Sequence, residues 1–307
     1  MTILKPLPAL PVTINDLFAN LEVKTHDAKT VTVEIESKNK DHGVTAVSAN
    51  GKIVVSGGQE SDNGITINLE RKTKKKGKTT IHVKNISGSN IDIAGGHGIS
   101  NISITGEGIT TKVIITVPKG TPIEVLRVDG EVKIGDTEGE LLIGRKSGNT
   151  KIGKVASLTI GLGMSATAEV EGVLGNVYTN LKMSSKLRIK SGEAGTVKVW
   201  QANSSSFIFD GQADNTTVES GMSAATYIDN IVGSLTADIG PSSTFEVSQG
   251  RVDRLQTKQG MSSKLLFGGT ATDANVELEM SASITITKVI NNPVVKRGMS
   301  TSVKIGR

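Results

Sequence analysis

The chain has 307 residues, no cysteine, and a formal net charge of +5. The absence of cysteine excludes disulfides, thiolate metal sites and cysteine nucleophiles. Aromatic residues make up only 3% of the chain and glycine contributes 35 residues, a composition that favours many tight turns between paired strands.

The N-terminal segment, residues 1–20, carries one lysine and a proline-interrupted apolar stretch. It lacks a charged start followed by a long apolar run, so we predict no signal peptide. No stretch of the chain approaches 18 consecutive apolar residues, so we also predict no membrane span. The expected location is cytoplasmic, or extracellular at the cell surface if a leader has been removed.

Residues 1–120 are rich in short apolar or alternating segments that predict strands. Asn-Gly pairs at positions 50–51 and 63–64 indicate hairpins, and hairpins pair their strands antiparallel. We therefore predict an N-terminal β-rich domain over residues 1–120 that merges into the segment behind it. The expected strands cover residues 31–35, 53–56, 65–69, 91–93, 102–104 and 113–117.

A basic cluster lies between two of these strand-like segments, residues 65–69 and 80–83. A hairpin tip of this kind would contact an anionic surface, or it would simply be a solvated loop that keeps sheet edges soluble. The solvated loop is favoured, and nucleic acid is not an expected partner, because no aromatic residue interleaves with the lysines. The cluster comprises Arg71, Lys72, Lys74, Lys75, Lys76 and Lys78.

From residue 121 onward the chain repeats with a period of about 19 residues. Such a period is typical of stacked architectures, in which one unit cannot bury its apolar face alone. A serine marks the repeat nine times, at Ser147, Ser165, Ser184, Ser204, Ser223, Ser242, Ser262, Ser281 and Ser300.

Apolar residues occupy the fourth and sixth positions after the residue that precedes each serine, as in Leu187 and Ile189. Their neighbours are mostly polar, so this half of the unit is predicted to be a strand with one buried face. Turn compositions separate it from a second apolar segment. The fold predicted for residues 121–307 is an all-β, right-handed parallel β-helix with coils of about 19 residues.

Methionine precedes six of the serines, at Met164, Met183, Met222, Met261, Met280 and Met299. Strict alternation places this column on the inward face, where methionine would fill a core corner. If the Met-Ser pair is itself the turn, the methionines instead line an outer stripe that would act as a contact surface. The serine hydroxyls are expected to bond to one another and to the turn backbone.

The segment 113–144, VIITVPKGTPIEVLRVDGEVKIGDTEGELLIG, resembles bacterial β-strand-repeat proteins of the DUF4097 type. The later Gly-Met-Ser units resemble the related "head GIN" or adhesin-head domains. The resemblance covers roughly residues 100–307. It implies a β-helix, frequent export, and in most members no assigned activity.

No set of residues predicts catalysis, so we expect no enzyme activity, cofactor, metal or small-molecule substrate. The four histidines have no ligand-like spacing. Asp210 and Asp229 fall in one outward column, and one such pair is weak support for an acid–base dyad.

The last unit begins at Met299 and stops after its first strand. An uncovered coil would expose Val303 and Ile305 and unpaired backbone groups to another chain. The function expected from these features is a non-enzymatic, self-assembling scaffold, joined end to end through Met299, Val303 and Ile305. The alternatives are an adhesin-like surface or binding module and, with less support, a carbohydrate-active β-helix enzyme.

Overall fold

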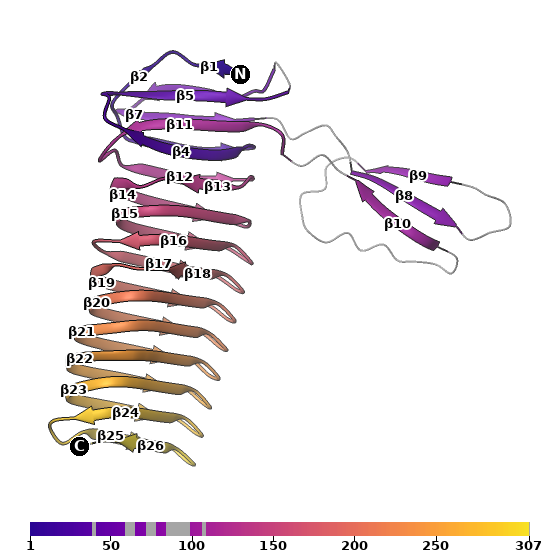
Figure 1. Ribbon diagram of the computed structural model, residues 1–307. Helices are drawn as coiled ribbons and strands as arrows, with labels where there is room; N and C mark the ends of the chain where they lie inside the picture. The colour runs from indigo at the N-terminus through magenta and orange to yellow at the C-terminus, as the bar shows by residue number, and fades with distance from the viewer. Residues whose placement is uncertain (39–40, 59–64, 72–77, 84–98, 106–108, 307) are drawn as a thin grey trace.

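The computed structural model describes residues 1–38, 41–58, 65–71, 78–83, 99–105 and 109–306. Within these ranges the chain is built from strands, and no helix is present. Most of the strands stack into one rod, with the N-terminus near one end and the C-terminus at the other (Figure 1). The prediction of a β-solenoid with coils of about 19 residues is confirmed.

Successive coils pair in parallel with equivalent residues opposite one another, as Lys186, Ser206 and Ala225 illustrate. In Figure 1, β16 and β24 run leftward on the near side and the chain returns behind them, so the descending coil is right-handed. Single long strands span the coils of β20 (Ser206–Ser220), β21 (Ala225–Ile239), β22 (Thr244–Gln259) and β23 (Lys264–Leu278).

The other coils of the repeat are made of shorter strands and one further long strand. They comprise β12 (Ile123–Val128), β13 (Val132–Ile134), β14 (Thr137–Arg145), β15 (Asn149–Leu162), β16 (Thr167–Val173), β17 (Val177–Leu181), β18 (Lys186–Ile189), β19 (Glu193–Gln201), β24 (Ser283–Val289), β25 (Val294–Arg297) and β26 (Ser302–Ile305).

Alternation along each strand fills a narrow core. Phe207 and Phe209 of β20 point inward, and Leu187 and Ile189 lie opposite them in the preceding coil. All four side chains are buried. Because parallel register is kept from coil to coil, each inward position becomes a continuous apolar column.

The N-terminal strands extend the same stack. β3 (Val12–Leu17) pairs in parallel with β12 and with β7 (Lys52–Gly57), and β4 (Asn20–His26) pairs in parallel with β13 and with β11 (Lys112–Pro118). Buried side chains from residues 12–55 and from the repeat belong to one hydrophobic cluster. The strands on the two sides of the predicted boundary at residue 120 therefore share one sheet and one core.

Antiparallel pairing occurs at the outer end of this stack. β5 (Thr30–Glu36) pairs antiparallel with β11, with β1 (Thr2–Ile3) and with β2 (Leu7–Pro8), and β6 (Thr45–Ala49) pairs antiparallel with β7. The N-terminal end of the rod is thus covered by β5 and β6, which run against the coil direction, with β1 and β2 on the far edge of β5.

A separate three-stranded antiparallel sheet lies between β7 and β11 in the sequence. β8 (Ile65–Arg71) pairs with β9 (Lys78–Val83) and with β10 (Ile99–Thr105). The hairpin predicted around the basic cluster is present, with Arg71 and Lys78 at its strand ends. Lys72, Lys74, Lys75 and Lys76, and the strand predicted at residues 91–93, lie outside the described residues.

None of the described segments is a helix long and apolar enough to cross a membrane.

The burial pattern of β18 yields a test of the register. Replacing Ile189, which is fully buried, with aspartate should lower the free energy of unfolding by about 4 kcal/mol, because a charge enters an apolar core. Replacing the exposed Lys186 of the same strand with aspartate should change it by less than about 0.5 kcal/mol. Chemical denaturation followed by circular dichroism measures both, and similar losses at the two positions would contradict the register.

Gln259 provides a second test of the core, in which a substitution is expected to raise stability. Its side chain is fully buried, neither amide atom has a hydrogen-bond partner among the described residues, and it lies between Ile239 and Leu278 in one inward column. An unpaired buried amide is destabilising by about 1–3 kcal/mol. The substitution Gln259→Leu should therefore raise the free energy of unfolding by about that amount, and a clear loss of stability would show that the amide is satisfied.

Candidate assembly surfaces

The coils of the repeat turn a sharp corner at the position where the Met-Ser pair recurs. The corner is a four-residue turn closed by a hydrogen bond between its ends, as from the Ala166 amide to the Gly163 carbonyl at 3.3 Å. Methionine takes the second position and serine the third, where φ is positive. Positive φ at the third position alone is the signature of a type II turn.

The repeat serines adopt a backbone conformation that is uncommon outside glycine. The eight from Ser165 to Ser300 have φ between 55° and 59°. Each amide from Ser165 to Ser281 donates to the carbonyl at the methionine position of the next coil, for example Ser262 to Met280 at 3.0 Å and Ser281 to Met299 at 2.9 Å. The recurrence of serine therefore marks a backbone ladder that runs along the corner. Ser147 departs from this pattern, because Gly148 takes the left-handed conformation there.

The expected hydroxyl bonding at the corner comes largely from a different serine. The residue after the repeat serine points inward, and its hydroxyl donates to a backbone carbonyl of the turn. Ser185 does so to Lys182 at 2.6 Å and Ser263 to Gly260 at 2.7 Å. This small inward residue closes the corner of the core.

The six methionines lie on the outside, so the inward position favoured by strict alternation is wrong. Their side chains are 44% to 72% exposed. Because the serine backbone is left-handed, the methionine and the serine both point outward. The residue after the serine is the first to point into the core again. Pro241 stands in the same column, and proline favours the second position of such turns, so the sequence did contain a signal for the outer placement.

We call the six exposed side chains the methionine ridge; its members are Met164, Met183, Met222, Met261, Met280 and Met299. Asn203 and Pro241 interrupt it at two coils. Figure 1 shows one such corner, between β25 and β26, at the edge opposite the β24–β25 connection.

The exposure of the ridge predicts its reactivity. Dilute hydrogen peroxide should convert the six thioethers to sulfoxides about as fast as methionine in a short peptide, while the strand signal in circular dichroism persists. Mass spectrometry of peptides sampled over time measures the rates. Oxidation that becomes fast only after denaturation would show that the methionine side chains are buried and would contradict their outer placement.

A second candidate surface is the edge of the last described coil. β25 pairs with β23 and β26 pairs with β24, and the other edges of β25 and β26 have no strand partner among the described residues. Beside them is a hollow of about 590 Å³, which we call the terminal hollow; its apolar lining includes Val289, Ile290, Pro293, Val295, Val303 and Ile305.

Burial changes sharply between the last two coils. Ile284 and Ile286 of β24 are buried, whereas Val303 and Ile305, which pair with them in β26, are only partly buried. Met299, at the corner of the same coil, is 72% exposed. The structure therefore places the three predicted interface residues on the last described coil, with the two β26 side chains in the hollow and Met299 on the ridge.

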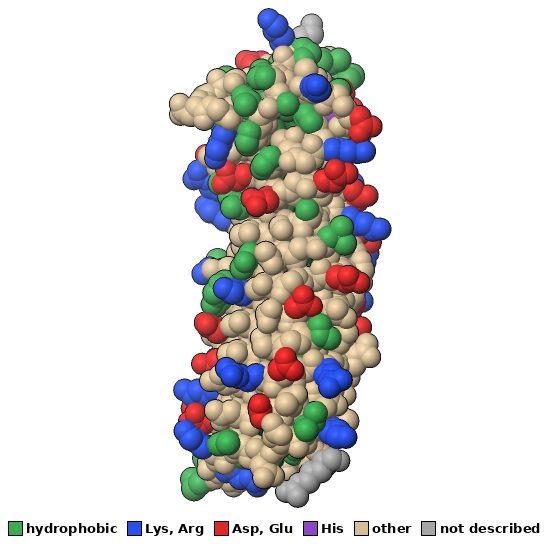
Figure 2. Space-filling model, turned by 90° about the vertical axis from the view of Figure 1, so that its left-hand side faces the viewer, with side chains coloured by type: hydrophobic (Ala, Val, Ile, Leu, Met, Phe, Trp, Pro, Cys, Tyr) green, Lys and Arg blue, Asp and Glu red, His purple; other side chains and the backbone are tan. Residues whose placement is uncertain are grey.

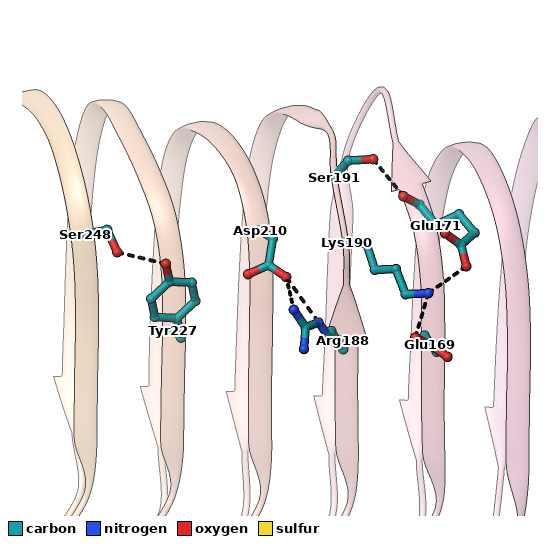
Figure 3. Close-up of polar contacts among 8 residues, drawn as sticks. All are labelled: Glu169, Glu171, Arg188, Lys190, Ser191, Asp210, Tyr227 and Ser248. Atoms are coloured by element: carbon teal, nitrogen blue, oxygen red, sulfur yellow. Dashed lines mark hydrogen bonds and ion pairs between the residues drawn. The ribbon is translucent and has the colours of Figure 1, made fainter.

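The outer face of β16 to β22 carries a ladder of polar contacts between neighbouring coils (Figure 3). Lys190 lies 2.7 Å from Glu169 and 2.8 Å from Glu171. Arg188 donates two hydrogen bonds to Asp210, at 2.6 and 3.1 Å. The hydrogen bond with Lys190 lowers the pKa of Glu169, and the hydrogen bonds to the two glutamates raise the pKa of Lys190.

These contacts are exposed to solvent, where ion pairs contribute little to stability. They link coils to one another. Asp210, one member of the aspartate pair considered for catalysis, is engaged by Arg188. Glu169, Glu171 and Asp210 are thus each paired with a basic residue of a neighbouring coil.

The other predicted chemistry-bearing residues do not form a site within the described ranges. His26 and His42 hydrogen-bond to nearby backbone groups. Only the strand position of His82 is described, and His97 lies outside the described residues. Among the residues that the structure describes, no cluster of histidine and carboxylate side chains could hold a metal ion.

Arg145 is a buried residue that the repeat pattern did not reveal. Its guanidinium donates to the carbonyls of Val128 and Gly130 at 2.6 and 2.7 Å. Burial lowers its pKa, against the effect of the nearby Asp129 carboxylate. Arg145 lies opposite Leu162 in an inward column, and its guanidinium satisfies backbone carbonyls of the preceding coil.

Charge is distributed without a strong bias on the edge of the rod that carries the β24–β25 connection. Figure 2 shows basic and acidic side chains interspersed along its whole length, separated by uncharged surface. A polyanion needs a contiguous basic surface. This edge does not provide one.

No family model matches the chain, and no curated protein matches it either. The resemblance to the DUF4097 type and to the adhesin-head domains stays a prediction.

Proposed function

We propose that the chain is a non-enzymatic structural protein that self-associates end to end through the last coil that the structure describes. The observation that carries this proposal is the terminal hollow beside the unpaired edge of β26. Backbone amides and carbonyls along such an edge are free to pair with a strand of another molecule. The same contact would cover the apolar side chains of Val303 and Ile305.

The outermost strands at the two ends of the rod differ in length and in composition. At the N-terminal end the outermost strands are β1 and β2, of two residues each, with Pro8 in β2, and β6, of five residues, which runs antiparallel to β7. Very short strands and proline are common devices that prevent edge pairing. At the other end, β25 and β26 have four residues each, contain no proline and continue the parallel coil, and their charged residues are Lys296, Arg297 and Lys304.

This asymmetry favours contact between two identical ends over head-to-tail stacking. A contact of β26 with β26 of a second copy is isologous and closes as a dimer about a two-fold axis. The two edge strands then run antiparallel, and the two hollows face each other. The paired ends would form a rod of double length.

The absence of cysteine allows a direct test with one introduced thiol. Lys304 is exposed on β26, and in the antiparallel register that pairs Val303 with Ile305 of the second copy, the two residues at position 304 lie opposite each other. The variant Lys304→Cys should therefore form an intermolecular disulfide under mild oxidation. Adding Val303→Lys and Ile305→Lys should reduce the cross-linked yield at least tenfold, since each lysine would bury a charge in the hollow.

The matched control is Lys304→Cys with Ser283→Lys, which adds a lysine to the neighbouring strand β24 at an outward position. It should cross-link as the single variant does. Non-reducing gel electrophoresis and light scattering measure both outcomes. A Lys304→Cys chain that stays uncross-linked and monomeric at high concentration would overturn the proposal.

A further inference from the structure

A second contact surface lies along the side of the rod, on residues distinct from the terminal hollow. Each member of the methionine ridge is followed by an exposed serine of the same turn, and glycine precedes four of the six. The large methionine side chains therefore project from a surface made of small, mostly uncharged residues. Contiguous exposed apolar surface of this kind marks contact sites on soluble proteins, and methionine adapts its shape to a partner.

The fold itself does not require methionine at these positions. Asn203 and Pro241 occupy the same place in the same turn, and they accept the same ladder bonds, from Ser184 at 3.1 Å and from Ser223 at 2.9 Å. A polar or a cyclic side chain therefore supports the corner equally well. The six exposed methionines are left without a structural role inside the monomer.

We propose that the methionine ridge binds the ridge of a second copy of this chain, with the two rods side by side. Ridge side chains repeat with the spacing of paired strands, about 4.8 Å. A second copy presents the same spacing over the same length, so the contacts stay in step along the whole ridge. An α-helix, with a pitch of about 5.4 Å, would drift out of step within a few turns.

Charge also favours a second copy. A surface that meets itself must not repel itself, and the ridge side chains carry no charge. Charges within the turns are confined to Lys182 and Glu279, at the first turn position of two coils. The broad outer face with Glu169, Arg188 and Lys190 is instead strongly charged.

The ridge contact is isologous and on its own closes at two molecules. Combined with the end contact, it links each rod to one neighbour at its tip and another along its side. Neither contact depends on the other, and together they join more than two chains. The ridge proposal therefore goes beyond the end-to-end function and can fail separately from it.

The experiment starts from the Val303→Lys/Ile305→Lys chain, in which the end contact is removed. Sedimentation velocity over a concentration series should show a monomer–dimer equilibrium through the ridge. Replacing Met183, Met222, Met261 and Met280 with glutamine should raise the dimer dissociation constant at least tenfold, because an amide of similar size resists burial. Replacing the same four with leucine is the matched control and should leave the constant within about threefold.

Circular dichroism confirms that each variant is folded. If the lysine variant does not fold, the glutamine and leucine sets are compared in the otherwise unchanged chain, where the glutamine set should reduce the assembly to the end-to-end dimer. A Val303→Lys/Ile305→Lys chain that folds and stays monomeric at millimolar concentration would overturn the ridge contact. Equal association of the glutamine and leucine sets would overturn it as well.

Discussion

The architecture depends on one backbone constraint, the left-handed conformation of the repeat serine. This residue lets the chain reverse at the corner, and its amide joins the carbonyl at the methionine position of the next coil. The bond fixes the height of each coil relative to the next. It also fixes which residues face inward, because the side chain two places after the methionine is the first to enter the core.

The parallel register carries that constraint along the rod. A residue type that recurs once per coil becomes a column, either inside the core, as with the apolar residues around Phe207, or outside, as with the methionine ridge. Stacking also means that each coil is covered only by its neighbours. The last described coil therefore has a less buried apolar side than the coils before it. The proposed end contact uses this exposed side, and the proposed ridge contact uses the outer column of methionines.

Much of this could be predicted from the sequence, because the repeat is local. The spacing of serines predicted the coil length, and alternation around Ile189 predicted the inward columns. The methionine column was the exception, since alternation was extended through a residue whose φ is positive. The proline at position 241 indicated a turn there, but it occurs in only one coil.

Features that depend on contacts between distant segments had no local signal. β3 lies between β7 and β12, and β4 lies between β11 and β13, so both pair with strands about 90 to 110 residues further along the chain, and no short motif specifies such pairing. Arg145 is buried next to Leu162 in an inward column, and its burial is explained only by the carbonyls of Val128 and Gly130 to which it donates. The exposure of Val303 and Ile305 was predicted from the incomplete last unit, but the wall that Val289, Ile290 and Pro293 form beside them was not.

The central claim is that the left-handed serine sets the corner, and the stability of three variants at one position tests it most directly. At Ser262, glycine adopts positive φ without strain and should leave the free energy of unfolding unchanged or higher by up to about 1 kcal/mol. Valine, whose branched side chain disfavours positive φ, should lower it by about 2 kcal/mol or more. Valine at the adjacent exposed Met261 should have little effect. If denaturation shows that position 262 tolerates valine as well as glycine, the corner does not depend on this conformation and the account is wrong.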